Sequence, residues 1–253
     1  MSTYMGWLKI AVVALALVLA PQAAQAQEQL ALMDDAIWAE FDENNADLWS
    51  QGDAINDPLE GWNRAMFAFN DKLYFWLLKP ISTGYAAIIP QGGRQAVRNF
   101  FSNLKEPVHI VNSLLQGKVK QAGVELTRFS VNSTVGVLGL FDIAGEHHNL
   151  VSHKDDLGQT FGSYGAGEGL YIVWPILGAS TVRDSVGLVG DAFLTPTTYL
   201  EHTWAQIGVR GLETVNRTSL SLGDYESIKS AAIDPYIAVR NGFKQIRDRE
   251  IQR

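Results

Sequence analysis

The chain has 253 residues, a formal net charge of −7, 47% hydrophobic residues and no cysteine. The missing cysteine excludes a disulfide framework, a thiolate metal site and a thiol nucleophile. Residues 28–57 carry nine acidic side chains and no Lys or Arg, whereas the chain beyond them carries 18 acidic and 19 basic groups. That larger part is near neutral, so it lacks the basic face expected of a nucleic-acid-binding protein.

The first 26 residues have the pattern of a cleaved signal peptide. Lys9 precedes an apolar run over 10–20 that is too short to cross a membrane, and Ala24-Gln25-Ala26 provides an A-x-A cleavage site. A retained anchoring helix is the alternative interpretation. Cleavage would leave about 225 residues, enough for one large domain or two small ones. We predict a signal peptide over 1–26, an acidic extension over 27–56 and a helical domain over 57–253.

The acidic extension also contains regularly spaced apolar residues, so it can form an amphipathic helix. Its charge allows two interpretations: a solvated, partly docked extension or a partner-binding arm.

Residues 57–80, DPLEGWNRAMFAFNDKLYFWLLKP, predict one helix. Asp57 can cap the first turn, Pro58 fits the first helical position, and Glu60 completes a start that resembles a capping box. Apolar residues recur at three- and four-residue steps and widen into a broad stripe. Because charged side chains interrupt the run, this helix is either clamped in a core or lies in a lipid interface. The interface candidates are Trp62, Phe67, Phe69, Tyr74, Phe75 and Trp76.

Further helices are expected along the rest of the chain, with caps at Thr181 and Asp234 and a helix start at Glu106-Pro107. Residues 171–174 are the only short apolar run that suggests a strand. The sequence therefore predicts a mainly α fold without internal repeats. The expected helices cover 91–104, 106–116, 118–134, 181–193, 202–222 and 237–253.

Residues 136–190 hold 11 of the 23 glycines, dispersed among large apolar and aromatic residues. This mixture is too apolar for a solvated linker. Glycine permits close backbone approach and unusual dihedral angles. The segment is therefore either a set of tight turns over a core or a pliable wall around a passage or groove.

Catalytic and metal-binding patterns fail on spacing. Gly165, Gly167 and Gly169 lack the spacing of a dinucleotide loop, and Ser163 does not lie in a nucleophile elbow. The one cluster of metal-binding side chains matches no ligand spacing and has the composition of an exposed polar loop. We therefore predict no metal and no cofactor. The cluster comprises His147, His148, His153, Asp155 and Asp156.

Arg128, Asp142, Arg183 and Asp184 are charges within apolar stretches. Because an unpaired buried charge is costly, they either pair with one another or line a wet interior.

Six sequence blocks, in order between residues 57 and 240, closely resemble the MlaA (VacJ) family of outer-membrane phospholipid-transport proteins. Any one block alone would be a modest signal, but six in order make a strong one. The blocks are DPLEGWNRAMFAFND, NFFSNLKEP, VNSLLQGK, ELTRFSVNSTVGVLGLFDIAG, DLGQTFGSYGAGEGLYIVWPILGASTVRD and DPYIAVR.

The resemblance implies a compact, ring-like helical protein in the inner leaflet of the outer membrane, with a central amphipathic channel. Misplaced phospholipids would leave the outer leaflet through this channel and pass to a periplasmic carrier of the MlaC type, which maintains lipid asymmetry. It also implies association with a trimeric porin and no covalent chemistry on the lipid, so the protein is not expected to be an enzyme.

On this basis the four charges in apolar stretches become candidates for the lipid path. The glycines in the apolar loop become hinge candidates. The path candidates are Arg128, Asp142, Arg183 and Asp184, and the hinge candidates are Gly136, Gly139 and Gly145.

The sequence departs from the family in its cysteine content. Many family members are lipoproteins with a lipid-bearing cysteine, whereas none of these 253 residues is a cysteine. We therefore expect a protein exported by a cleaved signal peptide to the periplasmic face of the outer membrane, held there by apolar surface or a partner. At about 25 cal/mol per Å² of buried apolar area, a modest contact with the acyl region suffices for insertion.

Two other functions stay open at the sequence level. One is an exported hydrolase acting at the membrane surface with His147, His148 or His153. The other is a structural scaffold that only binds porins.

Overall fold

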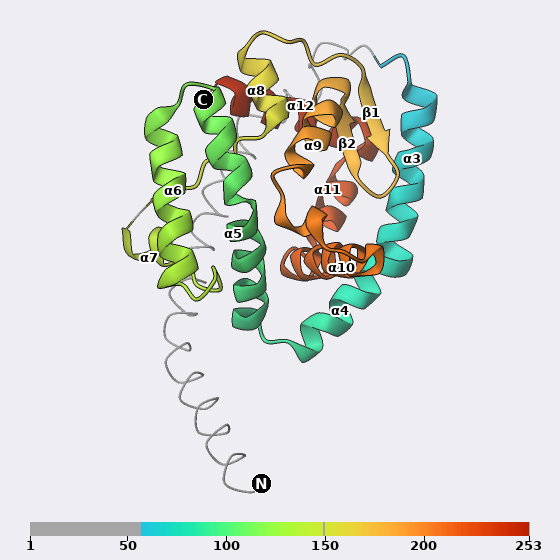
Figure 1. Cartoon of the computed structure of the whole chain (residues 1–253). Coiled ribbons are helices and arrows are strands. Elements are labelled where there is room, and N and C mark those ends of the chain that lie inside the picture. The colour runs from blue at the N-terminus through green and yellow to red at the C-terminus, as the bar shows by residue number, and fades with distance from the viewer. Residues whose placement is uncertain (1–56, 149, 253) are drawn as a thin grey trace, which may run out of the picture. The chain divides into compact units, whose positions relative to one another are not determined.

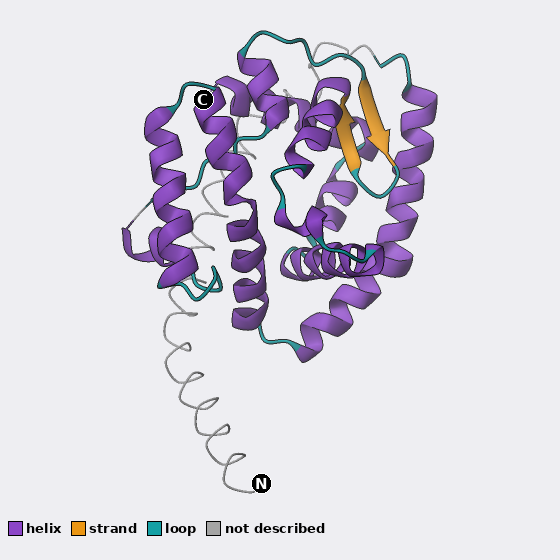
Figure 2. Ribbon diagram, in the orientation of Figure 1, coloured by secondary structure: helices purple, strands orange, loops and turns teal. Residues whose placement is uncertain are grey.

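The computed structural model describes residues 57–148 and 150–252 (Figure 1). The predicted signal peptide and acidic extension, 1–26 and 27–56, lie outside these residues. Helices dominate the described part of the chain, and its only strands are two short ones (Figure 2). The mainly α fold predicted from the sequence is confirmed.

The described chain begins with a long helical run. α3 (Glu60–Leu73) passes into a π-helical segment (Tyr74–Leu78) and then into α4 (Lys79–Ile88). Pro80 is the second residue of α4 and lies within the continuous helical run, just after the π-helical segment. The helical run therefore continues beyond Pro80, where the predicted helix ends.

The predicted capping start of this run is wrong. No side chain caps α3, and Glu60 pairs with Arg64 at 2.7 Å. The Asp57 carboxylate instead accepts hydrogen bonds from the Asn63 amide at 2.9 Å and from the Tyr236 hydroxyl. Because a buried carboxylate needs strong partners, tertiary donors hold Asp57 in place of the helix terminus.

α5 (Gln91–Leu115) and α6 (Val119–Thr134) pack against each other (Figure 1). The predicted break between 104 and 106 is wrong, because α5 runs through Pro107. A proline inside a helix removes one amide donor and disfavours the helix, but the contacts of α5 with α6 and α10 outweigh that cost. Gly117, with φ +74°, reverses the chain between the two helices.

Two short helices follow in the glycine-rich segment: α7 (Ile143–His148) and α8 (Leu157–Ser163). The Asp156 carboxylate caps α8 by accepting from the Gln159 backbone amide at 2.8 Å. Asp155 is buried. The prediction of an exposed loop is therefore wrong at Asp155, because the chain turns inward before α8.

The two strands form an antiparallel hairpin. β1 (Tyr171–Trp174) pairs with β2 (Gly178–Thr181), with Tyr171 opposite Thr181 and Trp174 opposite Gly178. The predicted strand over 171–174 is confirmed. α9 (Val182–Ala192) follows directly, and its predicted cap is also confirmed because the Thr181 hydroxyl accepts from the Asp184 amide at 3.1 Å.

The C-terminal part contains a 3₁₀ turn (Pro196–Tyr199), α10 (Thr203–Leu220), α11 (Asp224–Ala231) and α12 (Pro235–Gln252). The helices predicted for the regions of α10 and α12 are confirmed, whereas α11 was not predicted. The Asp234 carboxylate accepts from the first backbone amides of α12, which explains the Asp-Pro helix start.

A small apolar cluster joins α3, β1 and α12. Tyr171, Val173 and Tyr236 are buried in it, with Phe67 and Phe243 packed against them. Edge-to-face ring contacts, such as Phe67 on Tyr236 at 5.8 Å between centroids, order this cluster.

Candidate functional site

Polar and apolar side chains occupy unusual places in the described part of the chain. The largest side chains that are fully buried are all polar, whereas Trp76, Ile88 and Trp204 are 77–82% exposed. A soluble monomer rarely exposes large contiguous apolar patches, so such a surface calls for an apolar environment or partner. The fully buried set is Glu125, Asn63, Asn112, Asn216, Thr160, Ser82 and Ser113.

Exposed apolar side chains occur on most elements. They follow the outer face of α3 and α4, the loop after α6, the hairpin turn, and the surfaces of α9 and α10. Within the described residues, no helix is both long and apolar enough to cross a membrane. Examples are Trp62, Leu77, Ile81, Val135, Leu138, Ile176, Leu177, Val189, Phe193 and Ile207.

The six predicted interface residues divide into two groups. Trp62, Phe69 and Trp76 are exposed and recur every seven residues, so they share one face of the helical run. The other three point inward: Phe67 packs on Tyr236, and Tyr74 and Phe75 pack on Tyr225. The structure thus offers three of the six for direct contact with lipid.

The four path candidates lie in two charge clusters, each with buried and partly exposed members. The α6 charge cluster consists of Glu106 on α5, Glu125 and Arg128 on α6, and Asp142 before α7. Arg128 Nη2 donates to Asp142 Oδ2 at 3.1 Å, and Arg128 Nη1 donates to the Leu150 carbonyl. Arg128 thereby ties α6 to both ends of the α7 segment.

Asp142 is held as a carboxylate in this cluster. Burial opposes its ionisation, but the Asn132 amide, which donates to Asp142 Oδ1 at 2.8 Å, and Arg128 outweigh that effect. The pKa of Asp142 therefore lies below its usual range.

The α8–α12 charge cluster consists of Asp156, Arg183, Asp184, Arg247 and Glu250. Arg247 Nη1 lies 2.7 Å from Asp156 Oδ2, and Arg247 Nη2 lies 3.0 Å from Asp184 Oδ1. Arg183 Nε donates to Asp184 Oδ1 at 3.1 Å. Burial opposes the charge of Asp184, yet both arginines lower its pKa. This cluster fastens the start of α8 and the start of α9 to α12.

The structure therefore brings the four path candidates together two by two. Arg128 pairs with Asp142, and Arg183 pairs with Asp184, each at 3.1 Å. The sequence reasoning missed Glu106, Glu125 and Arg247. The buried faces of α5 and α6 that carry Glu106 and Glu125 are themselves mostly polar, so neither carboxylate stands out in the sequence. Arg247 lies in a basic helix and does not stand out either.

The three hinge candidates lie at close contacts. A Cβ atom at Gly136 would lie 2.3 Å from the Phe141 carbonyl oxygen, and one at Gly139 would lie 2.3 Å from Asn103 Cβ. At Gly145 the neighbour is the Asp142 carboxylate, at 2.5 Å. Close approach by itself accounts for glycine at these positions, and the hinge role stays a prediction.

The described members of the predicted His and Asp cluster have separate partners. Asp155 accepts from Ser113 and Gln121, Asp156 belongs to the α8–α12 charge cluster, and His153 lies beside Glu125. Within the described residues no three His, Asp or Glu side chains are placed to share a metal ion.

Two asparagines of α3 bind the free edge of β1. The fully buried Asn63 donates to the Tyr171 carbonyl at 3.0 Å and accepts from the Val173 amide at 2.8 Å. Its side chain thus makes the two hydrogen bonds that a neighbouring strand would make.

Asn70 repeats this contact seven residues later. It donates to the Trp174 carbonyl at 2.9 Å and accepts from the Ile176 amide at 2.7 Å. Seven helical residues span about 10.5 Å and three strand residues about 10 Å, so both clamps fit one strand. Asn70 therefore holds the hairpin turn, where Ile176 has φ +68° and is 76% exposed.

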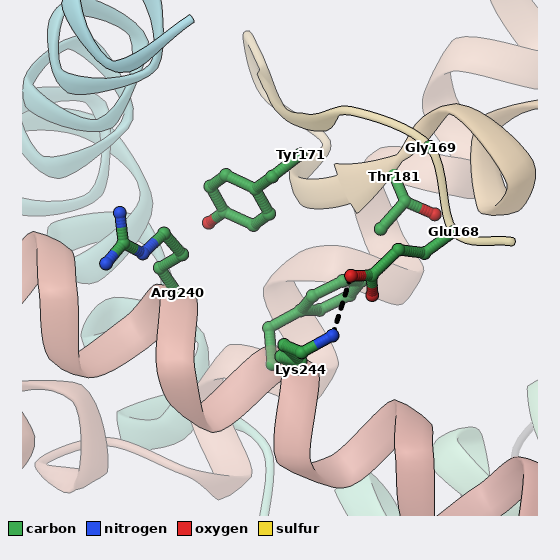
Figure 3. Close-up of a pocket in the computed structure, with 7 residues that line it drawn as sticks. Glu168, Gly169, Tyr171, Thr181, Arg240 and Lys244 are labelled. Carbon is green, nitrogen blue, oxygen red and sulfur yellow. Dashed lines mark hydrogen bonds and ion pairs between the residues drawn. The ribbon is translucent and has the colours of Figure 1, made fainter. Parts of the chain in front are cut away.

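A small cavity lies between the hairpin and α12 (Figure 3). It measures about 20 Å³ and is lined by Tyr171, Arg240 and Lys244, whose ammonium pairs with Glu168 at 2.6 Å. That volume holds about one water molecule. The cavity is too small for a phospholipid headgroup.

These features define a class of protein: a mainly helical, membrane-associated protein with apolar side chains on its outer surface and charges buried in pairs. The family described as MlaA lipoprotein matches residues 55–250, and the chain belongs to this family.

Relatives of known name support the same family. The chain is 36% identical over 197 residues to the intermembrane phospholipid transport system lipoprotein MlaA of Escherichia coli (strain K12), covering 76% of this chain and 77% of the relative. The protein of the same name from Haemophilus influenzae is 33% identical over 210 residues, covering 80% and 81%.

A solved structure, described as "Structural basis for maintenance of bacterial outer membrane lipid asymmetry", has a similar fold. It superposes with a TM-score of 0.70 at 34% identity and covers 78% of this chain and 99% of the solved one.

These comparisons correct the predicted localisation. The family and its named relatives are described as lipoproteins, so the expectation of a protein without a lipoprotein anchor is wrong. That expectation depended on one residue type missing from the sequence, whereas the family assignment depends on residues 55–250. The association with the outer membrane is supported.

Proposed function

We propose that this chain is the outer-membrane component of a phospholipid transport system. It removes misplaced phospholipids from the outer leaflet and thereby maintains lipid asymmetry. Family membership over residues 55–250 carries this proposal, and the outward-facing apolar side chains support it. The protein then passes the lipid to a periplasmic carrier of the MlaC type, works beside a trimeric porin and makes no covalent change to the lipid.

The proposed mechanism is passive translocation. Unassisted flip is slow because a headgroup must lose its water in the apolar core. A helical protein with lipid-compatible outer faces and polar groups inside offers the headgroup hydrogen-bonding partners while the acyl chains stay in lipid. Arg128, Asp142, Arg183 and Asp184 remain our candidates for groups along this path. Their pairing leaves no isolated buried charge among them.

The full chain, purified in mild detergent, provides the direct test. Lipid mass spectrometry should find bound phospholipid, and its composition should stay constant during incubation. Membrane fractionation should place the protein in the outer membrane. Lipid turnover that is lost in His153→Ala would instead favour the hydrolase, and a preparation that captures porin but never lipid would favour the scaffold.

The exposed aromatic face of the first helical run gives a second prediction. Changing Trp62, Phe69 and Trp76 together to serine should weaken membrane association by several kcal/mol, because each large side chain contributes roughly 1.5–3 kcal/mol on burial. Flotation with outer-membrane lipid vesicles measures the loss. Serine at the exposed polar positions Glu60 and Lys72 is the matched control and should float like the parent chain.

We further propose that the hairpin turn takes part in lipid passage and that Asn70 sets its position. Asn70→Ala removes two hydrogen bonds from the turn without touching the buried Asn63 clamp. We expect outer-leaflet phospholipid in cells to change relative to the parent chain, while the melting temperature falls by only a few degrees. Unchanged lipid asymmetry would remove the turn from the mechanism.

A further inference from the structure

Two carboxyl groups face each other between α5 and α6 in full burial. Glu106 is 3% exposed and Glu125 is completely buried. Arg128 lies between them, with Nε 3.7 Å from Glu106 Oε1 and 3.8 Å from Glu125 Oε2. Both distances are too long for hydrogen bonds, and Arg128 Nε has no hydrogen-bond partner. The other two guanidinium nitrogens donate to Asp142 and to the Leu150 carbonyl.

The charges around this pair do not balance. Glu125 and Arg128 face it from α6, and Asp142 faces it from the segment before α7. His153, from the segment before α8, lies 3.7 Å from Glu125 and is 43% exposed. Arg98, from α5, also interacts electrostatically with Asp142. With two arginines against three carboxylates, full ionisation would still leave surplus negative charge in a buried site. Two adjacent buried carboxyl groups relieve such a surplus by keeping one proton.

The hydrogen bonds place that proton on Glu106. Both Glu125 oxygens already accept hydrogen bonds, from the His153 backbone amide and from the Ser152 hydroxyl at 3.5 Å, whereas Glu106 Oε2 has no hydrogen-bond partner. Glu106 can then donate to Glu125, and this contact is part of what holds its proton.

The Glu125 carboxylate also connects two parts of the fold. Through His153 and Ser152 it holds the segment between α7 and α8 against α6. Two residues after His153, the Asp155 side chain is bound by Ser113 of α5 and Gln121 of α6. This segment leads directly into α8 and the α8–α12 charge cluster.

We propose that the proton shared by Glu106 and Glu125 is a latch: while it is bound, residues 150–153 stay on α6, and when it leaves, they detach. Loss of the proton puts two negative charges side by side in a buried site. Moving Glu125 and the attached segment towards solvent relieves the repulsion. The latch is a property of the fold, independent of whether the chain moves lipid.

The direction of the pH effect follows from the proton balance. Burial, and then the Glu125 carboxylate, raise the pKa of Glu106 to about 9 from an ordinary value of 4.5. The folded chain therefore binds a proton that the unfolded chain releases in this window. The stabilisation is complete below the ordinary pKa, declines as the pH rises, and is gone above about 9.

Trypsin cleavage after Lys154 reports on the latch, because this exposed lysine follows the held segment. The full chain in detergent is digested at pH 7 and at pH 9.5, and cleavage is compared with Glu106→Gln at the same pH, which cancels the pH dependence of the protease. We expect the cleavage rate of the parent chain, relative to that of the variant, to rise about tenfold or more between pH 7 and pH 9.5. A tenfold rise corresponds to the free energy of one pKa unit of difference between the held and the detached segment.

Glu125→Gln is the second variant and keeps the idea testable if Glu106→Gln does not fold. It removes the carboxylate that faces Glu106 and leaves Glu106 and Asp142 beside Arg128, so the rise should again disappear. Glu213→Gln, which breaks the more exposed pair with Lys105 on the same helix α5, is the control and should behave like the parent. An equal rise in parent and both cluster variants, or a Glu106→Gln chain already cleaved rapidly at pH 7, would overturn the proposal.

Discussion

Replacing Arg128 with methionine should lower the free energy of unfolding by about 3–5 kcal/mol, the usual cost of removing one partner of a buried ion pair. Methionine fills a similar volume but leaves Asp142 without its counterion and the Leu150 carbonyl without its donor. The Arg128 side chain is only 8% exposed and Asp142 is 32% exposed, so water replaces only part of what Arg128 provides. Thermal and urea unfolding of the full chain in detergent, followed by circular dichroism, measure the loss.

Two further variants separate charge from packing. Lys105→Met removes a cation from the partly exposed pair with Glu213 and should cost less than about 1 kcal/mol. Adding Asp142→Asn to Arg128→Met should recover part of the loss, because it removes the carboxylate that was left unpaired. If Arg128→Met costs no more than Lys105→Met, the α6 charge cluster does not stabilise the fold.

Local patterns in the sequence predicted much of the fold. The caps at Thr181 and Asp234 depend on side chains within three residues of the amides they bind, so the sequence alone reveals them. Asp57 shows the limit of this reasoning. It has the sequence context of a cap, but its carboxylate is bound by the side chains of Tyr236 on α12 and Asn63 on α3. No local rule contains a partner that lies 179 residues away.

The candidate site shows the same division. The sequence identified charged residues within apolar stretches, and pairing was one of the outcomes expected for them. It could not tell which charges pair, because Arg247 reaches Asp156 across 91 residues. The burial of Phe67 is a second example. Helical periodicity predicts on which side of the helix Phe67 lies, but only the position of Tyr236 decides that this side is covered.

α8 and α9 pack closely against each other, and a substitution at this contact gives the other large loss of stability that we expect. Gly187→Val should lower the free energy of unfolding by at least about 3 kcal/mol, at or beyond the upper end of usual overpacking costs. A Cβ atom at Gly187 would lie 2.4 Å from the Gly158 backbone nitrogen and 2.8 Å from its Cα. Both are backbone atoms, so no side-chain rotation can relieve the clash, and α8 and α9 must separate.

Two other glycines isolate this effect. A Cβ at Gly190 would meet only the end of the Leu157 side chain, so Gly190→Ala should cost less than Gly187→Ala. At Gly211, on α10, a Cβ would meet nothing within 4 Å, and Gly211→Ala should stabilise the fold by about 0.5–1 kcal/mol through helix propensity. Unfolding measurements on the three alanine variants give the order directly. α8 follows Asp156 and the segment that Glu125 holds, so separating α8 from α9 should also increase cleavage after Lys154. Equal losses of unfolding free energy at all three glycines would show that the contact between α8 and α9 has no special role.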